Sequence, residues 1–172
     1  MAAKPSNPDN AGASPGDASI SQTIDVQPRP ALIISGSATW DEGFKTLSET
    51  FAKLSDTMSK NNVVASGHPL AVFTSTDDSG FKYSAMIPIV KAPEGKTELT
   101  PDVKIGETPA GKAIRFQHRA SYDDIDSTYE AITAYLDEKG LEARNLFAEE
   151  YLNQTKTSDD PSLEVDIYVF LK

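Results

Sequence analysis

The chain of 172 residues contains no cysteine. Disulfide bonds, thiolate metal ligands and cysteine nucleophiles are therefore excluded. Its two histidines, His68 and His118, are too few for a multi-histidine metal site, so no metal and no other cofactor is expected. No apolar run approaches the roughly 20 residues needed to cross a bilayer, and we therefore expect no membrane span.

Basic residues are also scarce. Lys and Arg number 16 against 26 Asp and Glu, which gives a formal net charge of −10. Binding to phosphate backbones requires clustered Lys and Arg, so we expect no nucleic-acid partner. The excess of acid is typical of a soluble surface. With 38% hydrophobic and 24% charged residues, the composition favours one globular domain with its own core.

The first part of the chain has little to bury. Five of the eleven prolines lie in the first 30 residues, among many Ala, Ser, Asn and Gly. This composition predicts a disordered tail over residues 1–23 and a domain over residues 24–172. The tail lacks the apolar core of a signal peptide, although similar stretches often follow one that has been removed. Bacterial cytoplasm and periplasm both stay open as locations.

One phrase occurs twice in the chain, 82 positions apart. Ala38-Thr39-Trp40-Asp41 matches Ala120-Ser121-Tyr122-Asp123 in residue type, and the apolar stretches 31–34 and 113–116 precede the two copies at the same spacing. Each phrase follows a predicted strand and leads into a predicted helix with one apolar face. Two further strands follow each helix, because 68–75 resembles 146–153 and 81–89 resembles 163–171.

Each half is thus predicted to fold as strand, helix, strand, strand. Repeat 1 covers about residues 24–90, residues 91–110 form a linker, and repeat 2 covers about residues 111–172. Neither half can cover its own sheet face, so the two should share one core. The sequence therefore predicts an α+β fold built from duplicated β-α-β-β units.

The second half carries two motifs of a known family. His118, Ala120 and Tyr122 fall on a His-x-Gly-x-Tyr motif, with Ala in place of Gly, and Glu149 and Tyr151 fall on Glu-x-Tyr. Over residues 24–172 the chain resembles the GyrI-like small-molecule-binding domain. That domain is also the effector-binding domain of bacterial multidrug-sensing transcription activators, and it is related to the SOUL haem-binding fold.

The resemblance implies a fold and a mode of binding. We expect a pseudo-twofold saddle of antiparallel sheet with two main helices on one face and a ligand cleft between them. Relatives are fused to helix-turn-helix regions, whereas the residues before Ala31 are too rich in Pro and Gly for a helical bundle. We therefore expect a stand-alone binding unit, or an enzyme derived from one.

Glu149 is the strongest candidate for a functional side chain. Ala71 and Val72 of the first half correspond to Glu149 and Glu150 of the second. If Phe147 and Tyr151 face inward, Glu149 faces the cleft, whereas the other register places Glu150 there. The Glu-x-Tyr motif favours Glu149, although both carboxylates would reach water on an edge strand. A desolvated carboxylate should have a raised pKa, suited to a cationic ligand or to acid/base chemistry.

Aromatic side chains and one histidine complete the predicted site. Together with Glu149, the aromatic rings could form a box for flat cations, although each ring singly could be a packing residue. His118 is either a hydrogen-bonded core residue or a site residue, and the SOUL relationship adds haem ligation as a third possibility. The ligand-binding set is Glu149, Tyr151, His118, Tyr122, Trp40, Phe73, Tyr83 and Tyr168. Trp40 and Tyr122 should also pack at the strand–helix junctions, where truncation costs about 3–5 kcal/mol if they are fully buried.

Three functions are compatible with these residues. The first is a stand-alone sensor, carrier or sequestering factor for a hydrophobic or cationic small molecule. The second is a GyrI-like hydrolase of small electrophilic compounds, in which Glu149 and Tyr151 are catalytic. The third is inhibition of a partner enzyme, as the family name implies, although the sequence identifies no protein partner.

Overall fold

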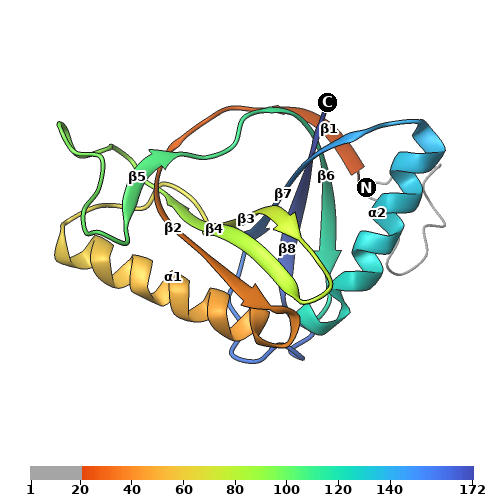
Figure 1. The fold of residues 1–172 in the computed structure, drawn as a ribbon, viewed down its shortest axis with the longest axis horizontal. Helices are drawn as coiled ribbons and strands as arrows, with labels where there is room; N and C mark the ends of the chain where they lie inside the picture. The colour runs from red at the N-terminus through yellow and green to blue at the C-terminus, as the bar shows by residue number, and fades with distance from the viewer. Residues whose placement is uncertain (1–20) are drawn as a thin grey trace.

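The computed structural model describes residues 21–172, in which eight strands form one antiparallel sheet and two helices accompany it (Figure 1). Most of the tail predicted over residues 1–23 lies outside the described residues. The first strand begins at Ser21, so residues 21–23 belong to the sheet. The strands are β1 (Ser21–Val26), β2 (Pro30–Thr39), β3 (Leu70–Thr76), β4 (Gly80–Pro88), β5 (Lys104–Glu107), β6 (Gly111–Arg119), β7 (Ala143–Tyr151) and β8 (Glu164–Leu171).

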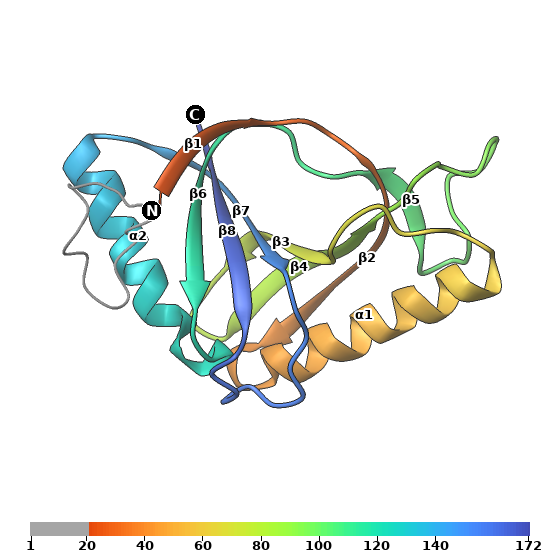
Figure 2. The ribbon, with the colours of Figure 1, turned by 180° about the vertical axis from the view of Figure 1, so that it is seen from behind.

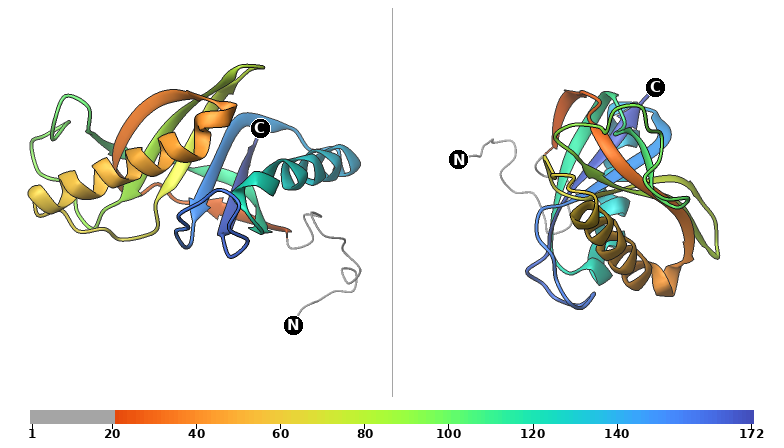
Figure 3. Two further views of the ribbon diagram at one scale, coloured as in Figure 1. Left: turned by 90° about the horizontal axis from the view of Figure 1, so that it is seen from below. Right: turned by 90° about the vertical axis from the view of Figure 1, so that its left-hand side faces the viewer.

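The two helices follow the repeated phrase. A single 3-10 turn, Trp40–Glu42 or Tyr122–Asp124, leads into α1 (Gly43–Lys60) or α2 (Ile125–Lys139). The helix α2 ends at Gly140, whose φ of 68° is in the left-handed region that glycine adopts without strain. Both predicted helices are thus present, each directly after its strand. The left view of Figure 3 shows them at opposite ends of the sheet.

The strand order of the sheet is consistent with a pseudo-twofold axis. Reading the sheet from its other edge gives the same order once each strand is replaced by the corresponding strand of the other half. The order is β1-β6-β8-β7-β3-β4-β2-β5, with β7 and β3 at the centre. Counterparts are β2 and β6, β3 and β7, and β4 and β8. This arrangement confirms the predicted α+β fold with a pseudo-twofold antiparallel sheet.

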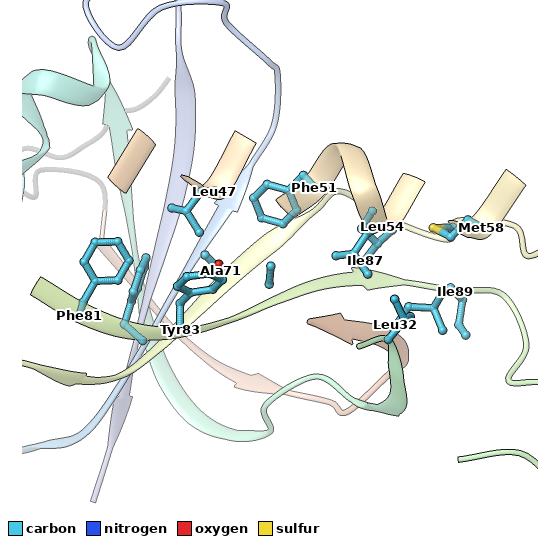
Figure 4. Close-up of a cluster of buried hydrophobic side chains, with 13 residues drawn as sticks. Leu32, Leu47, Phe51, Leu54, Met58, Ala71, Phe81, Tyr83, Ile87 and Ile89 are labelled. Atoms are coloured by element: carbon cyan, nitrogen blue, oxygen red, sulfur yellow. The ribbon is translucent and has the colours of Figure 1, made fainter. Parts of the chain in front are cut away.

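Each helix covers its own half of the sheet. The apolar stripe of α1, including Leu47, Phe51 and Leu54, packs on Leu32 and Ile87 of the strands beneath (Figure 4). Its counterpart α2 packs on the second half through a cluster that contains Ile114, Phe116, Ile125, Ile132, Val165 and Ile167. Tyr151 contacts both clusters, so the two halves share one continuous core on the helix-bearing face.

No helix of the described residues covers the opposite face. That face nevertheless holds a third buried cluster, because the twisted sheet curves around it. Its buried members are Ala31, Leu70, Val72, Met86, Ala113, Ala148 and Phe170. Residues 70–73 of β3 and 147–150 of β7, which pair with each other at the centre of the sheet, alternate between the two faces. Outside these stretches each strand has an irregularity, between Phe73 and Ser75 in β3 and between Ala143 and Phe147 in β7.

Two strands, β1 and β5, were not predicted. β5 lies within the predicted linker. Each of these two strands comes directly before one half of the sheet in the sequence but pairs with the other half. β1 precedes β2 but pairs with β6, and β5 precedes β6 but pairs with β2. Figure 2 shows β1 beside β6 at one edge of the sheet. This exchange ties the two halves together at both edges.

Candidate functional site

Glu149 lies at the centre of the molecule. It is the direct partner of Ala71 in the pairing of β3 with β7, and the neighbouring pairs are arranged symmetrically around these two residues. The pseudo-twofold axis thus passes between Ala71 and Glu149. The Glu149 side chain points to the helix-bearing face and is 2% exposed, whereas Glu150 points to the opposite face.

Three tyrosine hydroxyls donate hydrogen bonds to the Glu149 carboxylate. Tyr151 donates to Oε1 at 2.6 Å, Tyr129 to Oε2 at 2.7 Å, and Tyr122 to Oε1 at 3.3 Å. These residues come from β7, from α2 and from the 3-10 turn before α2. Three elements of the second half therefore converge on one buried carboxylate.

The pKa of Glu149 is raised above its ordinary value. Burial is the main cause, because it disfavours the charged form, and the three tyrosine hydroxyls oppose it by stabilising that form. The nearby Asp126 carboxylate raises it further. Burial and the Glu149 charge raise the pKa of Tyr122, Tyr129 and Tyr151 well above 10, so these tyrosines remain hydrogen-bond donors at neutral pH.

Two cavities lie on opposite sides of this cluster, one of about 420 Å³ and one of about 710 Å³. Glu149 lines the larger one. We call the larger one, of about 710 Å³, the carboxylate cavity. Aromatic rings and acidic groups dominate its wall, and no Lys, Arg or His among residues 21–172 lines it. Its residues are Trp40, Gly43, Phe73, Thr76, Asp77, Asp78, Phe81, Tyr122, Asp123, Ile125, Asp126, Tyr129, Phe147 and Glu149.

The mouth of the carboxylate cavity is acidic. Asp77 begins the turn between β3 and β4, where its carboxylate accepts hydrogen bonds from Ser79 and from the Gly80 amide. These bonds, those from Ser79 first, lower the pKa of Asp77, so it is an anion at neutral pH. Five carboxylates in all surround the cavity, yet no group of residues between 21 and 172 is arranged to hold a metal ion. The wall of the carboxylate cavity is therefore aromatic and strongly acidic.

Trp40 stands at the same mouth and is half exposed. Its side chain is 51% exposed, its indole N–H donates to the Asp77 carbonyl at 2.8 Å, and its ring lies 5.2 Å from that of Phe81. Trp40 is therefore not the buried junction residue that the sequence allowed, because the turn before α1 carries it over the rim instead of under the helix. Tyr122, its counterpart, faces Glu149.

The other predicted site residues lie in different places. Phe73 lines the carboxylate cavity, whereas Tyr83 is buried under α1 and donates to Thr50 Oγ1 at 3.0 Å. Tyr168 is on the opposite face, where it donates to Glu150 at 2.9 Å, and burial together with that carboxylate raises its pKa to about 12. The structure therefore brings together Glu149, Tyr151, Tyr122, Trp40 and Phe73.

His118 lies in the core of the second half. The side chain is 3% exposed, with Nε2 at 2.8 Å from the Ser121 carbonyl and Nδ1 at 2.7 Å from Thr128 Oγ1. The carbonyl can only accept, so Nε2 carries a proton. Both ring nitrogens are thus occupied, and His118 does not line either cavity.

Sequence reasoning missed Tyr129 as a site residue. The period of the apolar residues in 125–136 places Tyr129 on the buried face of the helix, and its ring does pack there, but its hydroxyl reaches Glu149. A signal was available in the repeat, because Tyr129 corresponds to Leu47 and Asp126 to Phe44, both 82 positions earlier. Where one copy of the repeat has a polar residue and the other has an apolar residue at the equivalent position, that position is a candidate for a functional difference between the two halves.

None of the helices between residues 21 and 172 has the length and apolar character that a membrane crossing requires. Comparison with proteins of curated function finds no significant relative. Solved structures with the same fold include a hydrolase from Listeria innocua, at 15% identity and a TM-score of 0.62, with 94% of each chain covered.

Two further solved structures share the fold. The C-terminal domain of EcmrR is 9% identical, with a TM-score of 0.72 over 89% of this chain and 97% of that one. SAV2435 bound to tetraphenylphosphonium is 11% identical, with a TM-score of 0.57 over 89% and 94%. The sequence model of the GyrI-like small molecule binding domain matches residues 21–172. With its fold, its central glutamate and this match over nearly its whole length, the chain belongs to the family of GyrI-like small-molecule-binding domains.

Proposed function

We propose that this protein binds hydrophobic, aromatic cations in the carboxylate cavity and acts as a stand-alone sensor, carrier or sequestering factor for them. The observation that carries the proposal is the buried Glu149 carboxylate, which forms no ion pair within residues 21–172. Its hydrogen-bond partners are neutral tyrosines, and the other charged groups around the cavity are acidic.

An unpaired buried carboxylate is costly, because burial removes its hydration without supplying a countercharge. A cation in the cavity would offset that cost and would also lower the raised pKa of Glu149. The rings of Trp40, Phe73 and Phe81 offer faces for stacking and for cation–π contacts. The acidic mouth adds a long-range attraction that favours association of cations over anions. Charge, aromatic lining and size therefore all favour the same ligand class.

The similarity to SAV2435 supports this proposal. That protein has been solved with tetraphenylphosphonium, a permanent cation with four aromatic rings. The same compound is thus a suitable probe for this chain, since it carries no group that titrates. Trp40, the single tryptophan, lines the cavity and provides an intrinsic fluorescence signal for binding.

The test compares two neighbouring glutamates on opposite faces of β7. Glu149→Gln keeps the shape and removes the charge, and it should weaken tetraphenylphosphonium binding by about tenfold or more, the scale of a charge-assisted contact. Glu150→Gln, the matched control, removes the same charge from the opposite face and should leave affinity within about twofold. Titration by calorimetry and by Trp40 fluorescence gives both values. Equal losses in the two variants, or none in either, would contradict the proposal.

A hydrolase is the second candidate. The observation that favours it is the pair of short hydrogen bonds from Tyr151 and Tyr129 to the two oxygens of a carboxylate whose pKa is raised. Glu149 could then accept a proton from water while a tyrosine hydroxyl stabilises charge on the leaving atom. The structural neighbours include hydrolases from Listeria innocua.

Turnover separates the two candidates. A hydrolase should consume small electrophiles such as epoxides or activated esters, which mass spectrometry detects as loss of compound. Glu149→Gln should then lower the rate by about 10²–10⁴-fold, as expected for a lost acid/base group, while binding survives. A protein that only binds leaves the compounds intact at any enzyme concentration.

A further inference from the structure

A second cavity lies beneath α1, on the other side of Tyr122 and Tyr151. It has a volume of about 420 Å³, and its wall combines one face of α1 with the connection between β7 and β8. We call it the neutral cavity, because no charged side chain lines it. Its residues are Phe44, Leu47, Ser48, Phe51, Ala52, Ser55, Pro69, Tyr122, Tyr151, Asn153, Gln154, Thr155 and Leu163.

The neutral cavity is the pseudo-twofold counterpart of the carboxylate cavity. One is built from α1 and the β7–β8 connection, and the other from α2 and the β3–β4 connection. Part of each wall corresponds to the other at the spacings of the repeat, 82 positions in the helices and for Leu163 and Phe81, and 78 in the central strands and the residues that follow them. The pairs are Phe44 and Asp126, Leu47 and Tyr129, Pro69 and Phe147, Tyr151 and Phe73, Leu163 and Phe81, and Gln154 and Thr76.

The two cavities differ in charge at equivalent positions. Phe44 stands in the neutral cavity where Asp126 stands in the other, and Thr155 stands where Asp77 does. The Tyr151 hydroxyl is directed to Glu149, so it is not free for a ligand of the neutral cavity. A charged ligand would find no countercharge in this wall, and its desolvation would be uncompensated.

The polar groups of the neutral cavity are few and uncharged. The Asn153 amide is already used, because it donates to the Ser162 carbonyl and accepts from the Glu164 amide. It thereby fixes the connection that forms one wall. The Gln154 side chain makes no hydrogen bond within residues 21–172 and is exposed at the cavity, where its amide can donate and accept.

We propose that the neutral cavity is a second binding site, for an uncharged, mainly apolar small molecule that carries one or two hydrogen-bonding groups. Phe44, Leu47 and Phe51 supply the apolar surface, and Gln154 supplies the polar contact. The volume suits a molecule of two or three rings. This inference goes beyond the proposed cation site and does not depend on Glu149.

The test uses two probes and four proteins. N-Phenyl-1-naphthylamine is neutral, apolar and fluorescent when it is removed from water, and tetraphenylphosphonium reports on the carboxylate cavity. Ser48→Trp adds a large ring at an exposed α1 position in the wall of the neutral cavity. Ser59→Trp, the matched control, adds the same ring at an exposed α1 position away from it. Glu149→Gln removes a charge that lines the carboxylate cavity and does not line the neutral one, and the wild-type protein is the reference.

The naphthylamine should bind the wild type saturably, and Ser48→Trp should weaken it about tenfold or more by filling the site. Ser59→Trp and Glu149→Gln should leave its affinity within about twofold. Tetraphenylphosphonium should show the reverse pattern, with loss in Glu149→Gln alone. If thermal denaturation shows that Ser48→Trp is not folded, Ala52→Leu replaces it, because Ala52 lies one helical turn further along the same wall.

Three results would overturn the second site. The first is the absence of saturable naphthylamine binding to the wild type, and the second is an equal affinity in wild type and both wall variants. Loss of naphthylamine binding in Glu149→Gln would place that probe in the carboxylate cavity and would also end the inference. Failure of tetraphenylphosphonium to bind contradicts the proposed function alone, so the two failures are distinguishable.

Discussion

The affinity for a permanent cation should fall when the pH is lowered from 8 to 5. Burial raises the pKa of Glu149, so its carboxylate takes up a proton at a higher pH than an ordinary glutamate does. Tetraphenylphosphonium gains from the ionised form only. Below the raised pKa, its affinity should therefore fall by about tenfold per pH unit, until it reaches the affinity of the protonated site.

The size of the total fall follows from the contact. A charge-assisted contact with a partly desolvated carboxylate contributes about 1.5–3 kcal/mol, or about 10- to 150-fold in affinity. The same limit should be reached at high pH by Glu149→Gln, which mimics the protonated form. Hydrogen bonds from Ser79 and Gly80 lower the pKa of Asp77, and Glu149→Gln keeps all the other acidic groups of the cavity, so it controls for their contribution.

Calorimetric titration at several pH values between about 5 and 8, with ionic strength held constant, measures this profile. Glu149→Gln should be flat over that range and is the essential control. If Glu149→Gln showed the same decline as the wild type, the titrating group would lie elsewhere. If the wild type were flat, either the pKa of Glu149 is not raised or the cation does not contact it.

Two further predictions concern stability. Because the pKa of Glu149 is raised by folding, the native state holds this proton more firmly than the unfolded chain, so its contribution is complete below about pH 4.3 and is lost as pH rises through the raised pKa. The melting temperature of the wild type should thus fall more than that of Glu149→Gln between pH 5 and 8, and parallel curves would contradict this. His118→Ala should lower the free energy of unfolding by about 3 kcal/mol, since it opens a cavity and removes the hydrogen bonds of the ring with the Ser121 carbonyl and Thr128 Oγ1, while cation affinity stays within about twofold. A selective loss of binding in His118→Ala would return this histidine to the site.

Alternation along the strand predicted that either Glu149 or Glu150 is buried, and the Glu-x-Tyr motif of the family favoured Glu149. Side chains of a strand alternate, so Phe147, Glu149 and Tyr151 must share one face once any of them is known to be buried. The same alternation places Glu150 on the other face. The helices were equally predictable, because their apolar stripes have a period that no strand shares.

Three features could not be predicted in this way. Alternation and periodicity report which face a residue occupies, but not how far a side chain reaches, so Tyr129 was assigned to the core and its hydroxyl was missed. The exposure of Trp40 depends on the path of the short turn before α1, for which the sequence gives no period. β1 and β5 are short strands whose partners lie 71 to 95 positions away, so no local sequence pattern predicts their pairing.

The direct pairing of Ala71 with Glu149 has a consequence for the covalent connection between the halves. Two separate copies of the second half, assembled as a symmetric homodimer, would place a glutamate at both positions of this pair. Two carboxylates would then face each other across neighbouring strands in a buried setting, where like charges repel strongly and neither is well hydrated. A homodimer could carry a glutamate at both of these positions or at neither, but never at one alone. Joining both halves in a single polypeptide lets the centre of a symmetric scaffold hold a single negative charge.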